Sequence, residues 1–320
     1  MISLEQAAAL LSNGKLVAIP TETVYGLGAD AKNPTAVQKI YTVKGRPATN
    51  PLIIHIPSSD AMTDWAIDIP PHAWALAKAF WPGPLTLVLK RHPRVPKIVT
   101  GGQDTVALRV PSHPLTLALL NQFGGGVAAP SANRYGRISP TTAQHVQEGL
   151  GDTVDYILDG GPCTVGIEST IISLVEPSPV ILRYGSISAL ELSGILGKLG
   201  SDKHKRQAIV VPGSSDSHYA PTQPLHLIDK AILIKTISQL AEQNKAISVI
   251  SFKDRPSSLP PFVIDWICMP SQPQAYAQQL YCQLHVLDKR KSDCIVVEAP
   301  PEQEDWLAIR DRLQRAAHRE

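Results

Sequence analysis

Short apolar runs alternate with amphipathic helical patterns through most of the chain. Apolar runs of this length are typical of buried strands, and a proline or capping residue ahead of a helical pattern is typical of a helix start. The strand-like runs lie at residues 16–19, 52–56, 85–89, 105–110, 127–129 and 171–174. The helical patterns lie at residues 4–12, 34–43, 71–80 and 190–199. Strands that alternate with helices predict an α/β fold.

The chain changes character near residue 205. Residues 201–206 are polar and charged, and residues 212–221 contain prolines and lack apolar periodicity, which favours a linker. Strand-like runs alternate with helical stretches again beyond this linker, which predicts a small parallel α/β domain, and no Gly-x-Gly-x-x-Gly sequence marks a dinucleotide site in it. We therefore expect a first domain at 1–205, a linker at 206–222 and a second domain at 223–320.

The overall composition is that of a soluble globular protein. The chain is 43% hydrophobic and 18% charged, and its net charge of +2 is too small to predict by itself a surface that binds nucleic acid. The four cysteines form no Cys-x-x-Cys pair, so neither a disulfide scaffold nor a structural zinc site is expected. The N-terminal residues lack a signal-peptide pattern and no apolar run approaches the ~20 residues that span a bilayer. We expect a cytoplasmic protein without membrane contact.

A basic loop at residues 44–51 is the first candidate for chemistry. It presents Lys44, Arg46 and Asn50 between a helical pattern and a strand-like run, and its glycine and prolines prevent it from continuing the helix. Arginine offers a planar fork of donors that suits phosphate, and lysine a compact charge beside it. The loop is interpreted either as a polyphosphate clamp or as a solvated turn with two surface cations.

Two further polar stretches directly follow strand-like runs. Residues 20–28 combine hydroxyls, a carboxylate, a phenol and two glycines, and residues 130–133 repeat the design with a proline and small polar side chains. Ligands of open α/β sheets sit beyond the carboxyl ends of strands, so these stretches are candidate substrate loops. The alternative is a polar connection in which Thr21 or Thr23 caps a helix.

Arg109 presents a separate question because it falls within an alternating strand-like run. A cation in the middle of a strand is costly to bury without a partner. The residue therefore lies either on an edge strand in water or beside a carboxylate, which a ligand could supply.

No catalytic nucleophile is indicated anywhere in the chain. The sequence has no Gly-x-x-x-x-Gly-Lys-Ser/Thr loop, no Gly-x-Ser-x-Gly elbow and no Ser/His/Asp spacing. The pattern favours a site that binds and orients its substrates and forms no covalent intermediate with the protein.

The polar stretches resemble the L-threonylcarbamoyladenylate synthase family, the YrdC-like proteins, in order and spacing. The segments that carry the resemblance are PTETVYGLG (20–28), KGRPATNPL (44–52), WPGPLT (81–86), PSAN (130–133), DGGPCTVGIEST (159–170), ILRYG (181–185) and HYAP (218–221). The HYAP segment followed by a second α/β domain is similar to the long, two-domain form of the family.

The resemblance implies a fold and an activity. The fold would be a twisted mixed-sheet YrdC-like (RibB-like) catalytic domain with a large concave cavity, a linker that acts as a lid, and a small Rossmann-like α/β domain. The activity would be nucleotidyl transfer: L-threonine, bicarbonate and ATP would give threonylcarbamoyl-AMP and pyrophosphate. Separate transferase proteins would use that product to modify tRNA, and the chain itself would contact tRNA at most weakly.

The resemblance also implies roles for individual residues. Lys44 and Arg46 would be catalytic, with Lys44 beside the phosphates. The threonine site would comprise Thr23, His55, Arg109, Ala129 and Ser169, with Arg109 pairing with the threonine carboxylate. The ATP site would comprise Arg46, Asn50, Thr105, Ser131, Asn133, Ser139, Arg183 and Tyr219. Mg²⁺ would be held mainly by the phosphates, with no protein side chain assigned to it.

Two departures from the family pattern and two other functions stay open at this point. Residues 214–217 carry no cation where the family usually has basic and aromatic residues, and Tyr184 replaces a common proline. The alternatives to the synthase are an RNA-binding module of the same fold and a carbamoyl-transfer domain with another substrate.

Overall fold

The computed structural model describes residues 3–176, 178–200, 209–213 and 218–318. These residues form two compact units. The first comprises Met1–Tyr135 and Ser139–Ser214, and the second comprises Gly136–Ile138 and Ser215–Glu320. The predicted linker at 206–222 lies partly outside the described residues, as do the polar break at 201–206 and the non-basic segment at 214–217, so the predicted domain boundaries stay a prediction.

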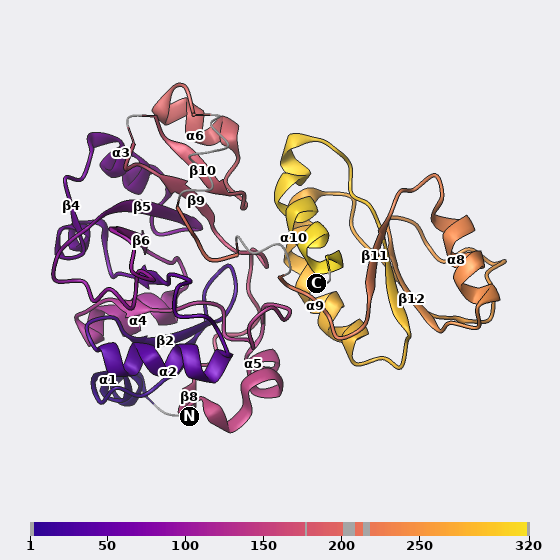
Figure 1. Cartoon of the computed structure of the whole chain (residues 1–320), viewed down its shortest axis with the longest axis horizontal. Coiled ribbons are helices and arrows are strands. Elements are labelled where there is room, and N and C mark those ends of the chain that lie inside the picture. The colour runs from indigo at the N-terminus through magenta and orange to yellow at the C-terminus, as the bar shows by residue number, and fades with distance from the viewer. Residues whose placement is uncertain (1–2, 177, 201–208, 214–217, 319–320) are drawn as a thin grey trace. The chain divides into compact units, whose positions relative to one another are not determined.

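A mixed sheet of ten strands forms the centre of the first unit as described (Figure 1). Its strand order is β10-β9-β5-β6-β3-β7-β2-β1-β8, and β4 pairs with β5. The strands are β1 (Val17–Ile19), β2 (Gly26–Asp30), β3 (Ile53–His55), β4 (Ala66–Ile67), β5 (Leu85–Arg91), β6 (Thr105–Arg109), β7 (Val127–Ala128), β8 (Tyr156–Ile157), β9 (Thr170–Ser173) and β10 (Val180–Arg183). Parallel and antiparallel pairs both occur, so the prediction of a mixed α/β sheet is confirmed.

Helices α2, α3, α5 and α6 cover one face of this sheet and form the main core with it. The helices of the unit are α1 (Leu4–Ser12), α2 (Pro34–Lys44), α3 (Pro71–Phe80), α4 (Pro114–Phe123), α5 (Ala143–Leu150) and α6 (Ala189–Leu196), with short 3₁₀ turns at Ser59–Asp64 and Gly151–Thr153. Buried residues of α2, α3, α5 and α6 pack with Ile54, Leu87, Leu108 and Ile172 of the sheet. Figure 1 shows α3 and α6 side by side at the end of the unit that holds β9 and β10.

The opposite face of the sheet carries the polar residues. Ile53 pairs with Ala107 and His55 with Arg109, and alternate residues of a strand share a face, so all four side chains lie on this side. Apolar residues cover its two flanks. Helices α1 and α4 pack on Val17 and Val127 at one flank, and Val211 packs with Ile171 and Ala107 at the other. Buried polar side chains between these flanks include His55 of β3, Thr86 of β5 and Arg109 of β6.

The second unit contains a parallel sheet of four strands in the described residues, in the order β11-β14-β12-β13. The strands are β11 (Leu225–Ile228), β12 (Ile247–Ser251), β13 (Val263–Cys268) and β14 (Cys294–Glu298), and the helices are α8 (Leu233–Glu242), α9 (Pro273–Asp288) and α10 (Leu307–Ala317), with a 3₁₀ turn at Glu304–Trp306. Helix α8 packs on the face that carries Val249 and Val296, and α9 and α10 lie on the other side (Figure 1). The predicted parallel sheet of the second domain is confirmed.

The structure differs from the sequence interpretation at several short elements. Gly26 and Gly28 are predicted in a polar loop, yet both lie in β2, where they pair with Ile19 and Val17. A side chain at either position would contact the neighbouring strands closely, so small residues suit a buried strand here. Helix α4 and strand β13 have no counterpart among the predicted elements, because a short apolar run does not distinguish buried helix from strand by periodicity alone.

Gly185 allows the chain after β10 to approach the segment that leads into β9. A Cβ at this position would lie 2.3 Å from the Thr170 nitrogen and 2.6 Å from the Ser169 carbonyl carbon. Both are backbone atoms that cannot rotate away. We expect Gly185→Ala to lower the free energy of unfolding by about 1–3 kcal/mol, the usual cost of overpacking. Urea unfolding measures this.

The matched control for Gly185→Ala is Gly149→Ala within α5, where no described atom lies within 4 Å of the added Cβ. Alanine there is expected to stabilise the protein by up to about 1 kcal/mol, because a helical glycine is entropically costly. Equal stability of the two variants would show that the close approach at Gly185 is unimportant.

Candidate functional site

Arg109 is the central cation of the polar face. It ends β6, a strand held between β5 and β3, and the residue is 3% exposed. The prediction that it lies either on an edge strand in water or beside a carboxylate is decided by its surroundings. The Glu22 carboxylate lies 2.8 Å from its Nη2. Its Nε donates to the Gly83 carbonyl at 3.1 Å and its Nη1 to Thr23 Oγ1 at 2.8 Å.

Thr23 and Glu22 reach Arg109 because the chain turns sharply after β1. Thr21 Oγ1 accepts from the Val24 nitrogen at 3.1 Å and donates to the Val24 carbonyl at 2.6 Å. This side-chain turn replaces the helix cap that is one interpretation of Thr21 and Thr23. The turn directs the buried side chains of Glu22 and Thr23 toward Arg109 at the end of β6.

His55 and Cys163 complete this part of the site and carry no charge near neutral pH. Burial, reinforced by the Arg109 guanidinium, lowers the pKa of His55 to about 3. Burial, together with the Glu22 carboxylate, raises the pKa of the Cys163 thiol to about 12. The Glu22–Arg109 pair is therefore flanked by a neutral imidazole and a neutral thiol. Its own opposite charges balance.

The low pKa of His55 gives an expected dependence of stability on pH. Because the ordinary value is 6.5, the unfolded chain binds a proton below that pH while the folded chain binds none until about pH 3. Stability from this residue is complete above pH 6.5 and decreases as the pH falls, by up to about 1.4 kcal/mol per pH unit. His55→Asn is expected to show a shallower decrease between pH 6.5 and pH 4 in urea unfolding. The same change at exposed His72 should leave the slope unaltered, and an equal slope in both variants would contradict the prediction.

Ser169 and Arg183 form a second group on the same face, next to Thr86. Ser169 Oγ lies 2.7 Å from Thr86 Oγ1. Arg183 donates from Nη2 to Ser169 Oγ at 3.0 Å and from Nε to the Ser169 carbonyl at 3.0 Å. Its Nη1 donates to the Pro212 carbonyl at 2.9 Å. Strands β5, β9 and β10 thus bring together a hydroxyl predicted for threonine and a guanidinium predicted for the nucleotide.

Lys44 lies at the end of α2 and points at the backbone of residues 131–133. Its Nζ donates to the Ser131 carbonyl at 2.6 Å and also to the Asn133 carbonyl. Gly45 ends the helix in the left-handed conformation, with φ 65°, which turns the loop away directly after Lys44. Burial and the neighbouring Arg46 lower the pKa of Lys44 well below its ordinary value. The basic loop 44–51 and the candidate substrate loop 130–133 are therefore joined through the amino group of Lys44.

Arg46 and Asn50 face Tyr135 within the first unit. The Arg46 guanidinium lies 5.8 Å from the centre of the Tyr135 ring and donates from Nη2 to the Pro51 carbonyl at 3.0 Å. Asn50 Nδ2 donates to the Tyr135 hydroxyl at 3.0 Å. Arg46 is buried, so the interpretation of this loop as a solvated turn with two surface cations is wrong.

The remaining predicted residues lie at several places. Thr105 begins β6, on the same face as Arg109 and four residues before it. Ala129 follows β7 and donates its backbone N–H to the Ile53 carbonyl at 2.9 Å. Ser139 donates from Oγ to Glu168 Oε1 at 2.6 Å. All of these residues belong to the first unit.

Tyr219 belongs to the second unit. Its ring stacks on Tyr281 with centroids 5.7 Å apart, and the Arg312 guanidinium lies 5.4 Å from the ring centre. Its backbone is left-handed, with φ 64°. The predicted contact of Tyr219 with a nucleotide stays a prediction.

Glu22 and Thr86 lie on the polar face but are absent from the residues that the sequence predicts for the site. Glu22 pairs with Arg109, and Thr86 contacts Ser169. Glu22 could have been found, because it is the carboxylate of the stretch 20–28 and a mid-strand arginine calls for one. Thr86 offers no such signal, since a threonine in an apolar strand is ordinary.

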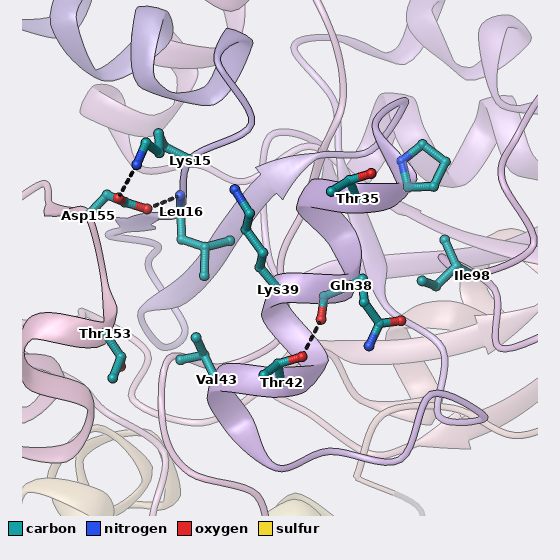
Figure 2. Close-up of a pocket in the computed structure, with 11 residues that line it drawn as sticks. Lys15, Leu16, Thr35, Gln38, Lys39, Thr42, Val43, Ile98, Thr153 and Asp155 are labelled. Atoms are coloured by element: carbon teal, nitrogen blue, oxygen red, sulfur yellow. Dashed lines mark hydrogen bonds and ion pairs between the residues drawn. The ribbon is translucent and has the colours of Figure 1, made fainter.

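The pocket of about 670 Å³ drawn in Figure 2 contains none of the predicted site residues. It lies along the outer side of α2, and its charged side chains already have partners. Lys15 pairs with Asp155 at 3.2 Å, and Lys39 Nζ donates to the Gly14 carbonyl at 2.7 Å. Its lining residues are Lys15, Leu16, Pro34, Thr35, Gln38, Lys39, Thr42, Val43, Ile98, Thr153 and Asp155.

The described residues contain neither a helix that could span a membrane nor a cluster of metal-ligating side chains. No helix among them is long and apolar enough to cross a bilayer. No group of three or more His, Cys, Asp or Glu side chains in the described part of the chain is arranged to hold a metal ion.

Comparison with known proteins matches both halves of the chain. A family model named for Sua5, YciO and YrdC, and described as "Telomere recombination", matches residues 9–185. A second model, described as "Threonylcarbamoyl-AMP synthase, C-terminal domain", matches residues 187–318. The chain is therefore a two-domain protein of the Sua5/YrdC class.

Individual relatives match over nearly the whole length. Threonylcarbamoyl-AMP synthase of Bacillus subtilis is 40% identical, over 98% of this chain and 92% of the relative. The enzyme of the same name from Pyrococcus abyssi is 38% identical, over 97% of this chain and 93% of the relative. The crystal structure of P. abyssi Sua5 complexed with L-threonine superimposes with a TM-score of 0.89 and covers 98% of this chain and 94% of that chain, at 37% identity. The chain belongs to the threonylcarbamoyl-AMP synthase family.

Proposed function

We propose that this protein makes threonylcarbamoyl-AMP and pyrophosphate from L-threonine, bicarbonate and ATP, and is thus a nucleotidyltransferase. The observation that carries the proposal is the gathering of Arg109, His55 and Arg183 on one face of one sheet. Full-length similarity to synthases, and to a relative that binds L-threonine, supports the same assignment.

The proposed amino-acid subsite lies around Arg109. Its guanidinium would pair with the threonine carboxylate, while Thr23, Ser169 and the neutral His55 would accept and donate hydrogen bonds. Ala129 would supply backbone polar groups beside Ile53. His55 suits this role because it stays neutral, so its unprotonated nitrogen can accept a hydrogen bond from a hydroxyl.

The proposed nucleotide subsite comprises the basic loop and its neighbours. Arg46 and Arg183 supply fixed positive charge, and Lys44 would lie beside the phosphates. The other members would be Asn50, Thr105, Ser131, Asn133, Ser139 and, from the second unit, Tyr219. ATP phosphates would provide most ligands of Mg²⁺, because this small hard cation is commonly bound through substrate phosphates and retained waters. The ion would neutralise phosphate charge.

The chemistry would need no protein nucleophile. The threonine ammonium and bicarbonate give a carbamate, one water and one proton. A carbamate oxygen then attacks the α-phosphorus of ATP, the bond to the bridging oxygen breaks, and pyrophosphate leaves. Fixed cations would stabilise the charge of the transition state, and positioning alone supplies on the order of 7–11 kcal/mol in favourable cases. Separate transferase proteins would consume the product in tRNA modification, with weak tRNA contact by this chain.

The test is dependence of turnover on all three substrates. Purified protein with Mg²⁺ and α-phosphate-labelled ATP should release pyrophosphate and form a labelled AMP adduct only when threonine and bicarbonate are both present. ATP turnover that ignores threonine would contradict the proposal. Equal turnover with serine or valine would instead assign a carbamoyl-transfer enzyme of another specificity. Tight tRNA binding with steep salt dependence and no turnover would assign an RNA-binding module.

A further inference from the structure

Glu22 has a carboxylate that the described structure uses only in part. It is 5% exposed, and its Oε2 lies 2.8 Å from Arg109 Nη2. Neither of its carboxylate oxygens has a well-aligned side-chain hydrogen bond among the described residues. Burial by itself would raise the pKa of Glu22, but the Arg109 guanidinium, together with the backbone N–H groups of Glu22 and Ser112, holds the pKa below its ordinary value. Glu22 is therefore a charged, buried acceptor with remaining capacity.

Arg109 also has remaining capacity. A guanidinium has five N–H donors. Within the described residues, Nε faces the Gly83 carbonyl, Nη1 faces Thr23 Oγ1 and Nη2 faces the Glu22 carboxylate. One further N–H on each of Nη1 and Nη2 therefore remains for a ligand. The guanidinium can thus receive a further carboxylate without giving up Glu22. Both members of the pair could contact one small ligand at the same time.

The charge balance decides what kind of ligand fits. Glu22 already neutralises Arg109, and the neighbouring His55 and Cys163 are uncharged near pH 7. A ligand with a carboxylate alone would leave a net negative charge in a buried place, which is costly. A zwitterion keeps the site neutral, because its ammonium can lie beside Glu22 while its carboxylate lies beside Arg109.

We propose that Glu22 is a binding and specificity-determining residue of the amino-acid subsite, which receives the α-ammonium group of the substrate and holds Arg109 in place for the α-carboxylate. This inference rests on the proposed function, because it takes the substrate of Arg109 to be an amino acid. It adds the acidic half of the subsite. The Glu22–Arg109 pair then selects α-amino acids over the corresponding carboxylic acids that lack the α-ammonium group.

The experiment compares wild-type protein with Glu22→Gln, which preserves size and removes the charge. KM for threonine is expected to rise about 10- to 100-fold, the usual range for loss of a hydrogen bond to a charged group, while KM for ATP stays within about twofold. The probe for selectivity is 3-hydroxybutyrate, which is threonine without its ammonium. Its inhibition constant, divided by KM for threonine, should fall in Glu22→Gln by a similar factor. Asp104→Asn, at an exposed carboxylate paired with Arg91, is the matched control and should leave all three constants unchanged.

Each outcome bears on the inference. A Glu22→Gln variant that binds threonine normally and still rejects 3-hydroxybutyrate would overturn it. Thermal unfolding followed by circular dichroism verifies that the variant folds. If the variant does not fold, Glu22→Asp replaces it, because aspartate keeps the charge on a shorter stem. Wild-type protein that binds 3-hydroxybutyrate as tightly as threonine overturns the inference by itself. Calorimetric threonine binding gives the same comparison without turnover.

The proposed function and the role of Glu22 fail separately. Threonine-independent turnover in wild-type protein defeats the proposed function, whereas normal wild-type turnover with an unchanged Glu22→Gln variant defeats only the role of Glu22.

Discussion

Replacing Arg46 with alanine is expected to lower kcat/KM for threonine-dependent pyrophosphate release by about 10²- to 10³-fold. This is the usual effect of removing one preorganised donor from a site where charge develops. Arg46 is buried, and Asn50, Pro51 and the Tyr135 ring hold its guanidinium, so it pays little entropy when phosphate arrives. The measurement is a coupled pyrophosphate assay at saturating threonine and bicarbonate.

Two further variants separate the charge of Arg46 from its shape. Arg46→Lys keeps a cation but loses the planar fork, so we expect intermediate activity. Arg94→Ala removes an exposed cation outside the site and should retain full activity. If Arg46→Ala retains full activity with an unchanged melting temperature, the basic loop does not act on the phosphates.

The second large effect concerns stability. Arg109→Met is expected to lower the free energy of unfolding by about 3–5 kcal/mol, because it leaves the Glu22 carboxylate buried without its counter-ion. Both side chains are almost fully buried, so solvent screens this pair little. Urea unfolding at pH 7.5 measures the loss. The variant should also lose threonine binding.

The loss of stability in Arg109→Met should depend on pH. In the wild-type protein the guanidinium keeps the pKa of Glu22 below its ordinary 4.5. In the variant burial is opposed only by the smaller effect of the backbone N–H groups of Glu22 and Ser112, so the pKa of the carboxyl is expected to rise above the unfolded value. The folded variant then binds a proton that the unfolded chain has lost, and its stability falls as the pH rises. The difference in stability from the wild type should be larger at pH 8 than at pH 5.

The double variant Glu22→Gln with Arg109→Met provides the control. It removes both charges, so it should be more stable than Arg109→Met alone, and its stability should lack this pH dependence. If the stability losses of Glu22→Gln and Arg109→Met add up to the loss of the double variant, the pair contributes no coupling energy.

Much of the fold can be predicted from local sequence. The helices Leu4–Ser12 and Pro71–Phe80 are predicted with their observed bounds, because a capping serine or an initial proline coincides with a clear helical pattern. Strand β6 is predicted within a residue of its end by alternation. The short strands β4 and β8 are not predicted, since strands of two residues have no period to detect. Strand β7 is predicted as the short run 127–129 that precedes Pro130.

The order of the strands lies beyond local sequence. His55 and Arg109 become neighbours because β3 and β6 pair in parallel, although the two residues are 54 positions apart in the chain. Nothing local to either strand specifies that pairing. It follows from which apolar faces can be buried together once the helices cover one side of the sheet.

The sequence by itself determined the chemical groups and the loops that present them: cations in the basic loop, hydroxyls after strand ends, and an arginine in mid-strand. Each of these depends on local pattern and turn residues. Only the tertiary structure decided which groups meet, and above all that Arg109 has a carboxylate partner within the chain, Glu22. Burial of a charge is favourable only with a counter-charge at contact distance, and the fold alone sets that distance.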